Sequence, residues 1–221
     1  MCAIVTIQKA GFPIEAIYRA AKAAFGTNPH GFGYTSNPDD GGEFEIRRIF
    51  KPEEGDFRHC AEVLHDRGGV LHARIASAGG VCPEGVHPFN AGVHRFLYMN
   101  GTLSTTRESL QKLGCANDSE IAARIVSGLS NEKAERALEF MSARFVLHDV
   151  LAGKIMITGS GWLDPGALPE KVREFGINIC GCGAHEIRLA LLQRLNKNND
   201  RDEGKTFVPK LAKPAAASGQ E

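Results

Sequence analysis

The chain has 221 residues, a length that suits one domain with a substantial buried core. Its 26 basic and 26 acidic residues cancel, and no cluster of one sign stands out, which argues against a nucleic-acid-binding protein. The apolar stretches are shorter than the roughly 18 residues of a membrane-spanning helix, and the first residues lack a charged signal-peptide start. We therefore expect a cytoplasmic protein that contacts neither nucleic acid nor membrane.

The six cysteines show no regular spacing, which in a chain of this size favours reduced thiols over a disulfide scaffold. Cys180, Cys182 and His185 are the best metal ligands by spacing, but a lone Cys-x-Cys with one His falls short of the four ligands of a zinc site. We expect neither a metal nor a cofactor.

The first half of the chain predicts strands that alternate with helices. Runs rich in apolar and β-branched residues predict strands over residues 3–7, 30–36, 43–50, 70–75 and 93–99. Apolar residues at helical spacing predict helices over 14–25 and 56–67. Turn residues 37–42 favour a hairpin between the second and third strands, and the Gly- and Pro-rich residues 76–92 predict a loop.

The second half predicts a block of helices followed by strands and one more helix. Helical patterns cover residues 105–113, 118–128, 131–142 and 185–196, and strand patterns cover 144–150 and 153–158. Strands, then helices, then strands again are typical of an α+β fold rather than a regular βαβ series. We expect a single domain over residues 1–196 and a flexible C-terminal tail over 197–221.

Cys2 carries the first candidate chemistry. Removal of Met1 makes Cys2 the chain terminus, and a small second residue is the kind that permits this removal. The free α-amino group has a pKa of roughly 7.7 to 8.0, so its neutral form can take the thiol proton near pH 7 without a separate histidine. The alternative is an ordinary cysteine beside a start codon.

A strand-end arginine is the second candidate. Arg74 lies at the end of the run from His72 to Gly80, with a hydroxyl at Ser77 and flexible glycines after it. The planar fork of an arginine matches a carboxylate in bidentate fashion, as a lysine would not. A surface ion pair is the alternative for Arg74.

Two further segments offer polar groups for a reaction centre. Asn100 and Gly101 follow a strand, and a side-chain N–H with a neighbouring backbone N–H can stabilise an oxyanion. Asn-Gly is equally an ordinary turn pair. Asp118 opens a predicted helix, where it either receives a substrate ammonium group or serves as a cap.

Together these segments resemble the class II glutamine amidotransferases, which belong to the N-terminal nucleophile family. The likeness covers about residues 2–160 and rests on an initial cysteine, His-x-Arg-x-Ala-Ser, Asn-Gly and Asn-Asp-Ser-Glu in the family's order. Residues 28–34 and His87-Pro88-Phe89 are similar to segments of the compact stand-alone members. Phe32, Ala78, Gly79 and Met99 depart from the family pattern, which leaves fine substrate selectivity open.

The resemblance implies a four-layer αββα sandwich and a set of roles. Cys2 would be the nucleophile and terminal base, while Asn100 and Gly101 would donate to the oxyanion. Arg74 and Asp118 would hold the carboxylate and ammonium of glutamine or a related γ-glutamyl small molecule, and Ser77 would line the same pocket.

The fate of the ammonia stays open at this point. Relatives of this family usually fuse the domain to a synthetase, whereas only about 60 residues follow residue 160 here. We expect either a separate synthetase subunit that accepts the ammonia or a stand-alone γ-glutamyl amide hydrolase. The third hypothesis is a degenerate member of the family that binds its ligand without cleaving it.

Overall fold

The computed structural model of the chain describes residues 2–193. The predicted tail over 197–221 and the domain boundary at residue 196 lie outside the described residues. Within the described part, no helix is both long and apolar enough to cross a membrane.

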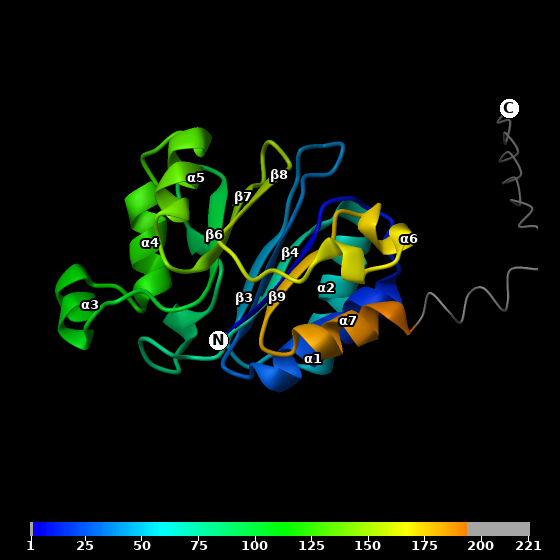
Figure 1. Cartoon of the computed structure of the whole chain (residues 1–221), viewed down its shortest axis with the longest axis horizontal. Coiled ribbons are helices and arrows are strands. Elements are labelled where there is room, and N and C mark those ends of the chain that lie inside the picture. Colours follow the sequence, from blue (N-terminus) through cyan, green and yellow to red (C-terminus); the bar gives the residue numbers. More distant parts are fainter. Residues whose placement is uncertain (1, 194–221) are drawn as a thin grey trace, which may run out of the picture.

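Two antiparallel sheets form the centre of the molecule (Figure 1). The first sheet has the order β3-β2-β4-β1-β9 and consists of β1 (Ala3–Ile7), β2 (Phe32–Ser36), β3 (Ile46–Ile49), β4 (Gly69–Ala73) and β9 (Asn178–Gly181). The second has the order β5-β6-β7-β8 and consists of β5 (Phe89–Asn90), β6 (Arg95–Asn100), β7 (Arg144–Asp149) and β8 (Lys154–Thr158).

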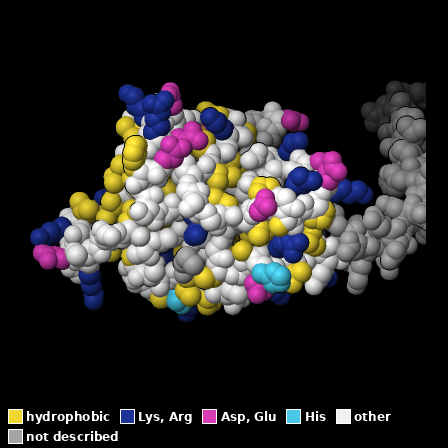
Figure 2. All heavy atoms as spheres, viewed as in Figure 1, with side chains coloured by type: hydrophobic (Ala, Val, Ile, Leu, Met, Phe, Trp, Pro, Cys, Tyr) yellow, Lys and Arg dark blue, Asp and Glu magenta, His cyan; other side chains and the backbone are white. Residues whose placement is uncertain are grey.

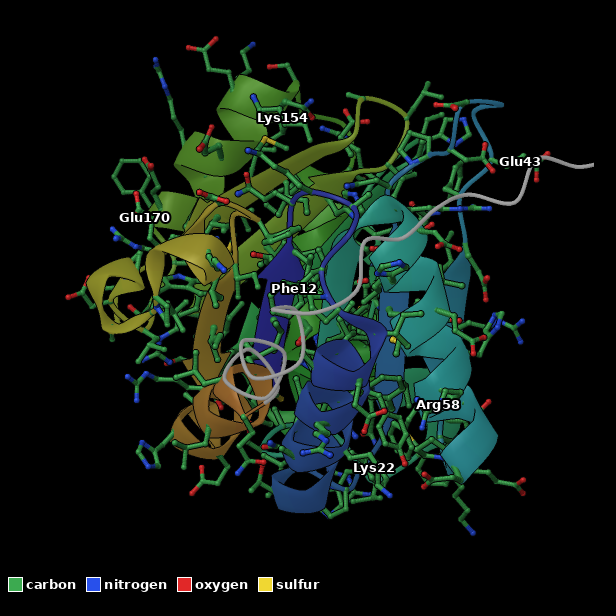
Figure 3. All side chains as sticks on the ribbon, turned by 90° about the vertical axis from the view of Figure 1, so that its right-hand side faces the viewer. Phe12, Lys22, Glu43, Arg58, Lys154 and Glu170 are labelled. Carbon is green, nitrogen blue, oxygen red and sulfur yellow. The ribbon has the colours of Figure 1, made fainter. Side chains whose placement is uncertain are left out.

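Helices cover the outer face of each sheet. The first sheet is covered by α1 (Ile14–Thr27), α2 (Glu54–Arg67) and α7 (Ala184–Leu192), which lie side by side in Figure 3. The second sheet is covered by α4 (Asp118–Val126) and α5 (Asn131–Glu139). The shorter elements are η1 (Pro83–Gly85), α3 (Arg107–Leu113), η2 (Pro165–Ala167) and α6 (Glu170–Arg173).

Alternation along the strands builds the layers. In β1, Ala3 and Val5 face the core under α1 and α2, while Ile4 between them faces the second sheet. In β6, Leu97 faces α4 and α5, while Tyr98 faces the first sheet. The layers therefore run helix, sheet, sheet, helix, and the predicted α+β class is confirmed.

The sequence prediction missed or misplaced a few short elements. It gave no strand at Asn178–Gly181 and no helix at Glu170–Arg173, and it described residues 76–92 as loop, although Phe89–Asn90 pairs with β6. Strand β9 has four residues and strand β5 has two, which are too few to show a period of their own. Pairing with distant strands, which local composition does not reveal, gives them their structure.

Charge is mixed over the surface. On the face drawn in Figure 2, basic and acidic side chains are interspersed. The described ion pairs are mostly short surface contacts such as Arg19–Glu15 and Arg124–Glu120, which contribute little to stability. Within residues 2–193 the charge arrangement thus agrees with the balanced composition.

Candidate active site

Cys2 is held in place by the two strands that flank β1. Antiparallel pairing sets Ala3 opposite Ala73 in β4 and opposite Gly181 in β9. The Cys2 thiol lies 3.6 Å from the carbonyl oxygen of Ile75, and the Cys2 carbonyl accepts a hydrogen bond from the N–H of Cys182 at 3.2 Å. The residue is only 6% exposed. The register of a central strand therefore fixes the sulfur.

The environment of Cys2 keeps the sulfur protonated. Burial raises the pKa of the thiol above its ordinary value, and the hydrogen bond to Ile75 and the charge of Arg74 lower it in part. The Asp118 carboxylate acts in the same direction as burial. Because the net shift is upward, nucleophilic attack by Cys2 requires a base that removes the proton.

Arg74 directly follows β4 and points into the protein. Its backbone continues the pairing with the segment before β2, through hydrogen bonds to Gly31 and His30. The side chain is only 2% exposed, and Nη2 donates to the carbonyl oxygen of Gly80 at 3.0 Å. The surface ion pair considered for Arg74 is therefore wrong.

The guanidinium of Arg74 is incompletely paired. Nη1 is buried without a hydrogen-bond partner, and no ion pair within residues 2–193 includes Arg74. Gly85 packs against the guanidinium and excludes solvent from that side. Burial lowers the pKa of Arg74, but an arginine stays charged at neutral pH. A buried positive charge that lacks an anion is costly unless a ligand supplies one.

Asp118 does not act as the cap of α4. Asn117 has that role, because its side chain accepts from the N–H of Glu120 at 3.0 Å. Asp118 is 3% exposed, and its Oδ2 accepts from the N–H of Leu103 at 2.7 Å. Burial raises the pKa of this carboxyl, whereas backbone N–H groups and the charge of Arg74 lower it. Asp118 thus faces the same interior as Arg74 and Cys2.

Asn100 and Gly101 reach the site from the second sheet. Asn100 ends β6 opposite Arg144 and is fully buried; the next strand begins only at residue 144, so the Asn-Gly pair does not form a hairpin turn. Its Nδ2 donates to the sulfur of Cys180 at 3.3 Å, and its Oδ1 has no partner. Gly101 adopts a φ of 147° and packs against Ala143, where a side chain would clash.

Ser77 lies in the loop after β4, at the edge of the group of residues around Arg74. Its hydroxyl contacts the Thr102 hydroxyl at 2.8 Å. Both residues line a cavity of about 580 Å³ between the loop after β4 and α3. Asn100 and Gly101 line a different cavity of about 450 Å³. The role of Ser77 in holding a carboxylate stays a prediction.

Two neutral histidines lie behind Arg74, between the sheets. The rings of His72 and His87 stack with centroids 4.0 Å apart, and both side chains are buried. His72 Nε2 donates to the carbonyl oxygen of Met99 at 3.3 Å. Burial lowers the pKa of His72 to about 3 and that of His87 well below its ordinary value. Neither ring therefore adds charge beside Arg74 near pH 7.

The sequence prediction missed the contribution of β9. Gly181 lies opposite Ala3, and a Cβ there would overlap the Cys2 carbonyl and stand 2.6 Å from Asn100 Nδ2. Cys180 and Gly181 therefore join the segment of Cys2 to that of Asn100. The only local signal was the short run Ile177-Asn178-Ile179-Cys180 before a glycine. Within residues 2–193, no cluster of His, Cys, Asp or Glu is arranged to hold a metal ion.

Comparisons with known proteins give distant likenesses to solved structures only. No protein-family model matches the chain, and no curated protein matches it. Among solved structures, it is similar to glutamine phosphoribosylpyrophosphate amidotransferase from B. subtilis complexed with ADP and GMP, with a TM-score of 0.47 and 16% sequence identity. The likeness covers 80% of this chain and 41% of that chain, so this chain spans about two fifths of that protein's length. Such a likeness assigns no activity to the chain.

Proposed function

We propose that the protein is an N-terminal cysteine amidohydrolase that releases ammonia from the side-chain amide of glutamine. The observation that carries the proposal is the buried guanidinium of Arg74, which forms no ion pair within residues 2–193 and lies within electrostatic range of Cys2 and Asp118. A ligand carboxylate would supply the missing charge, since Nη1 of Arg74 has no hydrogen-bond partner within residues 2–193 and a guanidinium is suited to bind a carboxylate.

An α-amino acid fits the pair of charges at this site. Arg74 would bind the α-carboxylate of the substrate, and Asp118, whose Oδ2 accepts from the N–H of Leu103, would bind its ammonium group. The γ-amide would then extend toward Cys2. The same arrangement favours a γ-glutamyl compound over an amide without a zwitterionic end.

The proposed reaction has two steps on Cys2. Once Met1 has been removed, the neutral α-amino group of Cys2 takes the thiol proton, and the thiolate attacks the γ-carbonyl carbon. Nδ2 of Asn100 and the N–H of Gly101 stabilise the oxyanion, and ammonia leaves with the transferred proton. Water then hydrolyses the γ-glutamyl thioester, which gives glutamate and restores the thiol.

The amine is the base that this mechanism requires. Because burial raises the pKa of the Cys2 thiol, the sulfur is not a thiolate at rest. The Asp118 carboxylate accepts a hydrogen bond from the N–H of Leu103, and burial lowers the pKa values of His72 and His87, so these groups are poor bases for the thiol proton. The helix-sheet-sheet-helix layers agree with the N-terminal nucleophile fold that this chemistry uses.

We further propose that the ammonia passes to a separate synthetase. In that case glutaminase activity should be weak in the isolated protein and rise when the synthetase is added. A stand-alone γ-glutamyl amide hydrolase, by contrast, should be fully active alone on its own substrate.

The test uses purified protein and glutamine. Ammonia and glutamate are measured, and intact mass shows whether Met1 has been removed. Cys2→Ala should lower turnover at least roughly a thousandfold, because it removes the covalent step. Cys60→Ala is the matched control, since Cys60 is fully buried between α2 and the first sheet and should leave turnover unchanged.

Two results would refute the proposal. One is turnover by Cys2→Ala equal to that of the unaltered protein. The other is full activity in protein whose mass still includes Met1, because its α-amino group could then not belong to Cys2.

A further inference from the structure

The strand that the sequence did not predict carries a thiol that contacts Asn100. Cys180 is 1% exposed, lies opposite Ile4, and faces the layer between the two sheets. Its sulfur accepts a hydrogen bond from Asn100 Nδ2 at 3.3 Å. This bond connects the sheet that carries Cys2 with the sheet that carries Asn100.

Within residues 2–193, one hydrogen bond orients the Asn100 carboxamide. Oδ1 is buried and without a partner, so the contact with Cys180 is the side chain's single described hydrogen bond. The terminal torsion of an asparagine is broad, and rotation would exchange Oδ1 and Nδ2. With Oδ1 turned toward an oxyanion, the carboxamide would repel the charge that it should stabilise.

We propose that Cys180 is a positioning residue for the oxyanion donor. Its sulfur holds one N–H of Asn100 Nδ2, which leaves the second N–H of the same nitrogen for the oxyanion of the substrate. This inference rests on the proposed hydrolysis by Cys2, and Cys180 itself touches no reacting atom.

Cys180 is suited to this role because it stays a thiol. Burial raises its pKa to about 11, so its sulfur is neither a competing nucleophile nor a buried negative charge near pH 7. A neutral sulfur is a weak acceptor, which is sufficient to select one orientation of the amide.

The experiment measures kcat and KM for glutamine in Cys180→Ala, Cys180→Ser and Asn100→Ala. We expect Cys180→Ala to lower kcat between about 10- and 100-fold with little change in KM, because a misaligned donor affects the transition state and not the bound zwitterion. Cys180→Ser restores an acceptor and should recover most of the lost kcat.

A double substitution separates positioning from packing. If Cys180 acts through Asn100, adding Cys180→Ala to Asn100→Ala should lower kcat no further. Cys60→Ala deletes the same buried thiol in the helix-covered core and should leave kcat unchanged. A further loss in the double variant, or an unaltered kcat in Cys180→Ala, would overturn the inference.

A second readout does not require activity. With asparagine labelled by ¹⁵N, the side-chain signal of Asn100 is identified by its absence in Asn100→Ala. This signal should shift in Cys180→Ala and stay in place in Cys60→Ala. An unshifted signal in Cys180→Ala contradicts the inference, whereas a folded but inactive unaltered protein contradicts the proposed function.

Discussion

At the scale of single residues, Arg74 is distinguished from Arg95, the other buried arginine within residues 2–193, by its partners. Arg95 is 9% exposed, and its guanidinium donates to the carbonyl oxygens of Leu129 and Ser127 and to Asn131. Arg74 donates to carbonyl oxygens through Nη2 only, and its Nη1 has no partner. Arg95 therefore stabilises the protein itself, whereas Arg74 has a nitrogen available for a ligand.

Arg74→Lys should raise the KM for glutamine about 10- to 100-fold, because a lysine keeps the charge but loses the bidentate fork. The measurement is a steady-state titration with glutamine. Arg95→Lys is the control: it should lower the melting temperature and leave KM within about twofold, since the two sites have no shared partner. An unaltered KM in Arg74→Lys would show that Arg74 does not bind the carboxylate of the substrate.

At the scale of elements, β9 closes the first sheet beside β1. Gly181 has a φ of 109°, which favours glycine, and its Cα lies against the Cys2 carbonyl. The adjacent hydrogen bond from Cys182 to Cys2 depends on this approach. The strand thus contributes to the site through its backbone as well as through Cys180.

Gly181→Ala should destabilise the protein by about 2 kcal/mol or more, because it combines a clash with an unfavourable φ. Glutamine turnover should fall as well, since Cys2 and Asn100 both border this position. Gly55→Ala in α2 is the control: no atom lies within 4 Å of the added Cβ, and we expect up to about 1 kcal/mol of stabilisation. Urea unfolding measures the free energy of unfolding of Gly181→Ala and Gly55→Ala, and equal values for the two variants would contradict the prediction.

At the scale of the whole molecule, a buried polar network joins the two sheets away from Cys2. Thr35 in β2 contacts the Tyr98 hydroxyl at 2.8 Å and His148 Nδ1 at 2.6 Å, and His148 Nε2 lies 2.9 Å from Asn37 Oδ1. Asn37 Nδ2 donates to two backbone carbonyls, so its Oδ1 accepts from Nε2–H. Nε2 of His148 therefore carries a proton, and burial lowers the pKa of the ring to about 4, so the ring is neutral near pH 7.

This network makes stability depend on pH. Burial lowers the pKa of His148 from 6.5 to about 4, so the unfolded chain takes up a proton before the folded protein does. The stabilisation is complete above pH 6.5 and is lost as the pH falls toward 4, by at most about 1.4 kcal/mol per pH unit. Burial also lowers the pKa values of His72 and His87, so the free energy of unfolding, measured by urea titration at several pH values, should fall over this range by more than His148 alone contributes.

His148→Gln is the variant that tests the assignment. Glutamine does not titrate, so the decline between pH 6.5 and 4 should become shallower while stability at neutral pH falls. His185→Gln is the control, because it removes an exposed histidine of α7 and leaves the network between the sheets intact. A decline of the same steepness in His148→Gln would assign the acid sensitivity to other groups.

Local patterns determined most of the elements. The strand at Ala3–Ile7, the helix at Ile14–Thr27 and the hairpin of β2 and β3 were predicted within a few residues, because period and turn chemistry are properties of neighbouring residues. The candidate residues Cys2, Arg74, Asn100, Gly101, Ser77 and Asp118 likewise came from the sequence and its resemblance to a family; their roles stay predictions.

Only the tertiary structure decided which of these residues meet and what completes their surroundings. The burial of Arg74 without an anion and the hydrogen bond from Asn100 to Cys180 both depend on segments far apart in the chain. No local period encodes such contacts, because they arise when strand pairing places a segment near residue 180 beside one near residue 2 and when the two sheets pack together. The sequence alone determined the chemical groups and most elements, and the packing decided their partners, charge states and orientation.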